Sequence, residues 1–257
     1  MTDLFIEKGS GPAVVFSHGT LMDATMFAPQ LDYLSALYRA IAYNSRVLVG
    51  PNVVHSLDDL ADDCHALLDR LHIETCVLGG MSVGGFMATT FALKYQNRLD
   101  GLVLIGAPSV SFSAEDQAAF RKKFSELDVE GMVPRDFAEW VAPHCFGETT
   151  RARNRALVDH WIERWTTEIP ARAVYHQGLS WIAKSDVTER LREIAVPTLI
   201  VHAEEDFQNP IENVRPMLEM LPNATLARVP EAGHSSNLEN PDVVNDAIGR
   251  FLETIYS

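Results

Sequence analysis

Short apolar runs, rich in β-branched residues, alternate along the chain with longer amphipathic stretches. Within each run the apolar residues occupy consecutive positions, which is typical of strands that are covered on both faces. The runs predict strands at residues 12–18, 38–43, 76–81, 101–107, 197–203 and 224–230, with residues 3–8 as a candidate antiparallel edge strand. The repeated strand–helix alternation predicts an α/β fold with a doubly wound, mostly parallel sheet.

Three amphipathic stretches predict helices that flank this sheet. The first, residues 56–73, opens with Ser56 and Asp59 at the spacing of a capping box, in which each residue satisfies a backbone N–H of the first turn. Apolar side chains then recur at helical spacing along the same stretch. Residues 83–98 and 241–255 are the other two predicted helices.

The alternation is interrupted between Ser109 and Lys184, where only helical patterns occur, at residues 113–128, 134–146, 152–169 and 171–184. The strand pattern resumes at Pro197, so we predict that a helical segment is inserted between two strands of the sheet. All four tryptophans of the chain lie in this segment: Trp140, Trp161, Trp165 and Trp181.

The charge balance argues against several kinds of partner. The 257 residues carry a formal net charge of -14, whereas binding to phosphates needs clustered cations. No apolar run reaches the roughly 18 residues that span a bilayer, and the opening MTDLFIEKGS has no basic and then apolar leader. Three cysteines, Cys64, Cys76 and Cys145, stand far apart, which favours a reducing compartment. We therefore expect a cytoplasmic protein with neither a nucleic-acid nor a membrane partner.

A serine lies in a glycine-rich stretch at the end of one predicted strand. Gly80-Met81-Ser82-Val83-Gly84 fits the pattern G-x-S-x-G, with a strand before it and a predicted helix after it. This is the setting of a nucleophile elbow, in which a sharp turn exposes the serine hydroxyl at the edge of the sheet. Glycine is needed at positions 80 and 84 because side chains there would clash. The alternative is a glycine-rich turn with a structural serine.

A serine nucleophile needs a base, and the base in turn needs an acid that orients it. His234 follows the last predicted strand and precedes the last predicted helix, which places it at the carboxyl edge of the sheet beside Ser82. Glu204, Glu205 and Asp206 follow the preceding strand, and Asp206 is best placed to hold the imidazole. Glu205 remains a competitor for that role.

Backbone N–H groups are expected to stabilise the oxyanion that forms when the serine attacks. One comes from the loop after His18-Gly19, at Thr20, and the other from Val83 at the start of the following helix. His18 is interpreted as a structural hydrogen-bonding residue beneath this loop rather than as a second base. The histidines are scattered and lack metal-ligand spacing, so neither a metal ion nor a cofactor is expected.

The stretches SHGTLMD, GGMSVGG, AEEDFQNP and AGHSSNLENP, in this order, resemble the α/β-hydrolase family over nearly the whole chain. The resemblance implies a catalytic triad of Ser82, Asp206 and His234. It also implies a helical cap of residues 109–184 over a core of residues 1–108 and 185–257. Within the family the chain is similar to enol-lactonases and small-ester esterases. One departure concerns residues 44–51, where many relatives have an aspartate followed by Arg-Gly-x-Gly-x-Ser, and it predicts a reshaped pocket rim.

The favoured function is hydrolysis of a small carboxylic ester through an acyl-enzyme on Ser82. Lactone hydrolysis, C–C bond hydrolysis and perhydrolysis would use the same triad, and a ligand-binding receptor on this fold is an alternative of another class. A homodimer is compatible with the sequence. The residues predicted to line the substrate pocket are Leu21, Met22, Met81, Trp140, Phe146, Trp161 and Trp181. For the aromatic residues of the insertion, an equally weighted alternative is that they form its own core.

Overall fold

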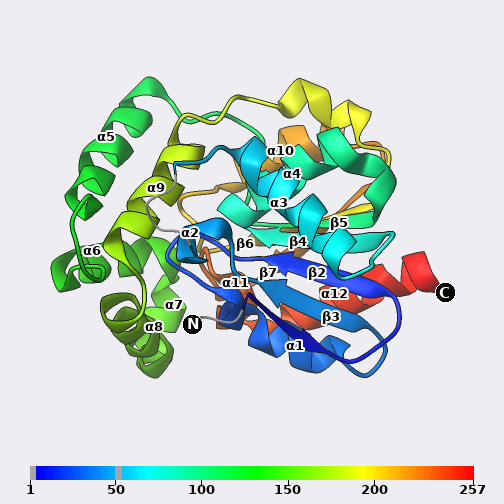
Figure 1. The fold of residues 1–257 in the computed structure, drawn as a ribbon, viewed down its shortest axis with the longest axis horizontal. Coiled ribbons are helices and arrows are strands. Elements are labelled where there is room, and N and C mark those ends of the chain that lie inside the picture. The colour runs from blue at the N-terminus through cyan, green and yellow to red at the C-terminus, as the bar shows by residue number, and fades with distance from the viewer. Residues whose placement is uncertain (1–3, 50–53) are drawn as a thin grey trace.

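A seven-stranded sheet forms the centre of the computed structural model, which describes residues 4–49 and 54–257 (Figure 1). The order of strands across the sheet is β1-β3-β2-β4-β5-β6-β7, and all neighbouring strands are parallel except β1 and β3. This confirms the predicted doubly wound, mostly parallel sheet with an antiparallel edge strand. The strands are β1 (Phe5–Lys8), β2 (Ala13–Ser17), β3 (Arg39–Tyr43), β4 (Cys76–Met81), β5 (Leu99–Ile105), β6 (Thr198–Ala203) and β7 (Ala224–Val229).

Helices cover both faces of the sheet, which explains why its central strands β2 and β4 are buried along their full length. On one face α3 and α4 lie side by side, and on the other α1 packs against α12 (Figure 1). Asp59 N–H donates to Ser56 Oγ and Ser56 N–H donates to Asp59 Oδ2, so the predicted capping box forms at the start of α3. The helices that flank the sheet are α1 (Ala28–Leu34), α3 (Leu57–Arg70), α4 (Val83–Tyr95), α10 (Ile211–Met220) and α12 (Pro241–Tyr256).

The segment between β5 and β6 is described completely, and it is helical as predicted. Its helices gather at the end of the sheet where the parallel strands finish (Figure 1). The single helix predicted over residues 152–169 is two helices in the structure, because Asn154 ends one and caps the next by accepting from Leu157 N–H. The helices are α5 (Ala114–Phe124), α6 (Arg135–Cys145), α7 (Glu148–Arg153), α8 (Arg155–Thr167) and α9 (Ala171–Ile182).

Several short elements complete the described chain. β5 ends at Ile105, two residues before the predicted end, because Gly106 takes a φ of 55° and turns the chain out of the sheet. Within residues 4–49 and 54–257, none of the helices combines the length and the apolar character that crossing a membrane requires. The short elements are η1 (Ala24–Phe27), α2 (Arg46–Val49), η2 (Gln96–Arg98), η3 (Ser125–Leu127), η4 (Thr188–Glu193) and α11 (Ser236–Glu239).

Candidate active site

Ser82 lies in a strained turn between β4 and α4. Its φ of 53° and ψ of -118° fall in a region that a residue with a side chain rarely adopts and that needs support from its surroundings. The flanking backbone is packed so closely that a Cβ atom on Gly80 would lie 2.2 Å from the carbonyl oxygen of Gly84. A Cβ on Gly84 would lie 2.1 Å from the carbonyl oxygen of Ser17. The spacing of the two glycines around Ser82 therefore has the steric cause that the sequence predicted.

His234 and Asp206 meet at the same edge of the sheet, one after β7 and the other after β6. His234 Nδ1 lies 2.7 Å from Asp206 Oδ2, and both side chains are largely buried. Asp206 Oδ1 accepts from the backbone N–H groups of Gln208 and Asn209, which fixes the carboxylate. Burial lowers the pKa of His234, but the charge and the hydrogen bond of Asp206 outweigh it, so the net shift is upward. This leaves Nε2 as the proton acceptor, since Nδ1–H donates to the carboxylate.

The neighbouring carboxylate, Glu205, faces a different element. Its Oε2 accepts from Thr149 N–H at 2.8 Å, and its Oε1 accepts from the Thr149 hydroxyl at 2.5 Å, both at the start of α7. An acid near the N-terminus of a helix is favoured by the helix dipole as well as by these hydrogen bonds. The structure therefore pairs Asp206 with His234 and uses Glu205 to attach the inserted helices to the sheet.

A cavity of about 390 Å³ brings Ser82 and His234 together. Of the predicted pocket residues, Leu21, Met22, Met81, Trp140 and Trp181 line this cavity. Phe146 and Trp161 do not, and these two predictions are corrected. Both are almost fully buried, Phe146 stacked on Trp165 with ring centroids 6.1 Å apart and Trp161 under the guanidinium of Arg164. They belong to the core of the insertion, as the alternative interpretation of its aromatic residues held.

Other residues of the cavity were not predicted. Phe112, Phe120 and Phe124 line one wall with Trp181, whose ring centroid lies 5.5 Å from each of theirs. The spacing of four residues between Phe120 and Phe124 is a sequence signal that could have placed these two on one face of α5, whereas Phe112 precedes the helix. At another part of the cavity the ring of His144 contacts those of Trp140 and Phe207 in tilted arrangements, with centroid distances of 4.6 and 5.3 Å, and Trp140 and Phe207 are 37% and 63% exposed. Further lining residues are Phe86, Gly106, Pro108, Asp116, Val141, Cys145, Gln208 and Asn209.

The loop after β2 carries Thr20, which lines the cavity, and Val83 is the first residue of α4. His18 supports this loop from below. Its Nε2 accepts from Ser45 N–H at 3.1 Å, so Nδ1 carries the proton and donates to the carbonyl oxygen of Gly19 at 2.8 Å. Burial lowers the pKa of His18 and so favours the neutral ring that this pair of contacts needs. The arrangement agrees with a structural role for His18.

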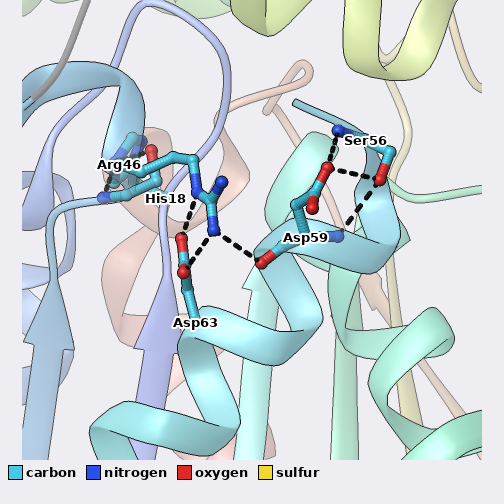
Figure 2. Close-up of polar contacts among 6 residues, drawn as sticks. His18, Arg46, Ser56, Asp59 and Asp63 are labelled. Atoms are coloured by element: carbon cyan, nitrogen blue, oxygen red, sulfur yellow. Dashed lines mark hydrogen bonds and ion pairs between the residues drawn. The ribbon is translucent and has the colours of Figure 1, made fainter. Parts of the chain in front are cut away.

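The segment that departs from the family pattern, residues 44–51, supports the same loop. Asn44 Oδ1 accepts from Ala24 N–H at 2.8 Å, just beyond the loop. Arg46 makes a bidentate contact of 2.5 Å with both carboxylate oxygens of Asp63 on α3 (Figure 2). Figure 2 also shows Arg46 reaching the carbonyl oxygen of Asp59, next to the capping box. Residues 50 and 51 of the segment lie outside the described residues.

Nothing in the described parts of the chain groups three or more His, Cys, Asp or Glu side chains in a way that could hold a metal ion.

Comparison with known proteins agrees with this combination of sheet, insertion and site. Residues 41–255 match the Ndr family, and the chain therefore belongs to that family, within the α/β-hydrolase superfamily. The fold and the family together define the protein as a hydrolase of the α/β-hydrolase class.

Individual relatives span nearly the whole chain. A protein of Caulobacter sp. (strain K31) provisionally named carbamate hydrolase is 27% identical over 97% of this chain and 95% of its own. The 3-oxoadipate enol-lactonase 1 of Acinetobacter baylyi is 25% identical over 96% of this chain and 90% of its own. Among solved structures, a thermophilic esterase of Thermogutta terrifontis superposes with a TM-score of 0.91 at 28% identity, over 98% of this chain and 93% of that one.

Proposed function

We propose that the protein is a serine hydrolase that cleaves a small carboxylic ester through an acyl-enzyme on Ser82. The observation that carries the proposal is the 2.7 Å pairing of His234 with Asp206 at a cavity that also contains Ser82 in its strained turn. Acyl transfer by a serine enzyme requires a nucleophile, a base that takes its proton and an acid that orients the base.

In this mechanism His234 Nε2 takes the proton of the Ser82 hydroxyl as Oγ attacks the carbonyl carbon of the ester. The negative charge that develops on the carbonyl oxygen is stabilised by the backbone N–H groups of Thr20 and Val83. His234 then gives its proton to the departing alcohol, and a water molecule activated by the same nitrogen hydrolyses the acyl-enzyme. Asp206 holds the tautomer and stabilises the imidazolium that forms in each step.

Residues 109–184 act in this proposal as a cap that closes the site from above, over a core of residues 1–108 and 185–257. The positions of helices α5, α6 and α9 are the evidence for this cap, because Phe120, Trp140 and Trp181 on these helices line the same cavity as Ser82. The apolar lining favours an uncharged acyl or alcohol group.

A fluorophosphonate probe tests the proposed nucleophile. Wild type should be labelled with a stoichiometry of one and should give a burst with p-nitrophenyl acetate or butyrate. Ser82→Ala should lose both, with turnover falling by about a millionfold, whereas Ser125→Ala, at an exposed serine of the insertion, should behave as wild type. An unlabelled wild type without a burst excludes the serine-hydrolase proposal.

Lactone hydrolysis is the second candidate, and the likeness to an enol-lactonase over nearly the whole chain favours it. The ring-opening reaction uses the same steps, except that the leaving alcohol stays attached to the acyl group. A panel of esters and lactones of equal carbon number, compared by kcat/KM, separates the two. C–C bond hydrolysis and perhydrolysis belong in the same panel. A receptor would instead keep its ligand affinity in Ser82→Ala while showing no turnover in wild type.

A further inference from the structure

Asp23 ends the loop that carries Thr20, and its side chain is almost completely buried, with 6% of it exposed. One carboxylate oxygen, Oδ1, accepts from Thr25 N–H at 2.8 Å and from the Thr25 hydroxyl, which caps the 3-10 turn η1. The other oxygen, Oδ2, lies 2.5 Å from Nη2 of Arg164, a residue of α8. This ion pair joins the loop after β2 to the inserted helices, 141 residues further along the chain.

Other hydrogen bonds hold the loop internally and to the residue that follows β3. Met22 N–H donates to the carbonyl oxygen of Gly19 at 3.2 Å, and Ala24 N–H donates to Asn44 Oδ1 at 2.8 Å. Leu21 has a φ of 67°, a conformation that a leucine keeps only where its surroundings determine it. Arg164 contacts the loop from the inserted helices, through its ion pair with Asp23. The guanidinium of Arg164 is itself held by the Glu168 carboxylate at 2.9 Å and by the ring of Trp161.

The charge of Asp23 matters because of where it lies. A buried carboxylate without a partner, three residues from Thr20, would oppose the negative charge that the oxyanion site has to stabilise. The guanidinium of Arg164 neutralises that carboxylate in place. Such a pair therefore serves the transition state, in which the carbonyl oxygen is charged, more than the bound ester, in which it is not.

We propose that Arg164 is a positioning residue for the oxyanion site: through Asp23 it holds the Thr20 loop in place from the inserted helices and cancels the carboxylate's charge. The inference rests on the proposed function, since it assumes that Thr20 N–H receives the oxyanion. It assigns the inserted helices a part in the chemical step in addition to lining the cavity.

Steady-state kinetics of five variants test the proposal. Arg164→Met should lower kcat by about 10- to 100-fold, the size of effect that a small displacement at a reacting centre produces, and should change KM by less than about threefold. Arg164→Lys keeps the charge without the planar fork and should fall between wild type and Arg164→Met. Arg155→Met removes an exposed ion pair with Asp159 on the same helix and should keep wild-type kinetics. In an Asp23→Asn background, where residue 23 has no charge to neutralise, the fall in kcat caused by Arg164→Met should be smaller by at least about fivefold than in the wild-type background.

Two further measurements separate this proposal from simple destabilisation and from failure of the proposed function. The inhibition constant of phenylboronic acid, which binds serine hydrolases as a tetrahedral anion, should rise in Arg164→Met in parallel with the fall in kcat. The fluorophosphonate should still label Arg164→Met at one site per chain, which shows that Ser82 remains the nucleophile. An Arg164→Met variant with wild-type kcat, or one whose loss is the same in the wild-type and Asp23→Asn backgrounds, overturns the inference. Loss of labelling in wild type overturns the proposed function instead.

Discussion

Glu205 Oε2 accepts from the backbone N–H of Thr149 at 2.8 Å, while the adjacent carboxylate of Asp206 reaches His234 at 2.7 Å. Two acids that are neighbours in the sequence thus have different partners, one in the inserted helices and the other in the loop after β7. Glu205 attaches helix α7 of the insertion to the end of β6, and Asp206 pairs with His234, the proposed base. Because the two acids are adjacent in the chain, a displacement of the insertion that moves Glu205 also moves the backbone of Asp206.

Replacing each acid separately should give different kinetics. Asp206→Asn should lower kcat by about ten-thousandfold, because the amide no longer fixes the reactive tautomer of His234. Glu205→Gln should leave kcat within about tenfold and lower the melting temperature, since it loses part of the hold on Thr149. Comparable losses of kcat in both variants, measured on folded protein, contradict the assignment of Asp206 as the orienting acid.

The pH dependence of kcat/KM should report the upward shift of the His234 pKa. The base must be neutral, so the rate should rise with pH through a midpoint above the ordinary histidine value of 6.5. Asp206→Asn should move this midpoint downward, because the attraction that favours the imidazolium is lost. In the folded state, the stabilisation by protonated His234 is fully present below 6.5 and is lost as the pH rises through the raised pKa. A rate that stays flat from about pH 5 to 8 argues against His234 as the base.

The sequence predicted those parts of the molecule that depend on local pattern and chain order. Strands and the capping box follow from periodicity, and the pairing of Asp206 with His234 follows from their places after successive strands. Lining of the cavity depends instead on how helices pack, which periodicity does not reveal. Phe146 and Trp161 lie on the inner side of the insertion, whereas Trp140 and Trp181, of the same residue class, face the cavity. The packing also explains Gly79, because a Cβ atom at that position would lie 2.5 Å from the ring of Phe16, a contact that the sequence pattern does not reveal.

The preference of the enzyme for acyl-chain length should depend on the aromatic wall of the cavity and not on the aromatic core of the insertion. Phe120→Ala removes a partly buried ring from that wall and should raise the ratio of kcat/KM for octanoate over acetate esters by about tenfold, the effect of one or two accommodated methylene groups. Phe146→Leu is the matched control, because Phe146 packs on Trp165 away from the cavity. It should lower the melting temperature and leave the ratio unchanged. A changed ratio in Phe146→Leu, or none in Phe120→Ala, contradicts the assignment of the wall.

Glu239 should hold the loop of His234 against the insertion. Its Oε2 accepts from Gly147 N–H at 2.7 Å, and its Oε1 accepts from Ser235 N–H at 3.1 Å, so one carboxylate bridges the start of α7 and the residue after the candidate base. Glu239→Gln replaces one acceptor by a donor that faces an N–H group, which should cost about 1–3 kcal/mol of unfolding free energy.

That cost corresponds to a fall in melting temperature of about 2–12 °C for a chain of this size. We expect kcat to fall as well, because His234 is less firmly held, while labelling of Ser82 persists at a lower rate. Glu189→Gln, which removes an exposed ion pair with Arg192, is the matched control and should leave both properties unchanged. Calorimetry and kinetics on the same preparations decide the point: a Glu239→Gln variant as stable and as active as wild type would show that the His234 loop keeps its place without this bridge.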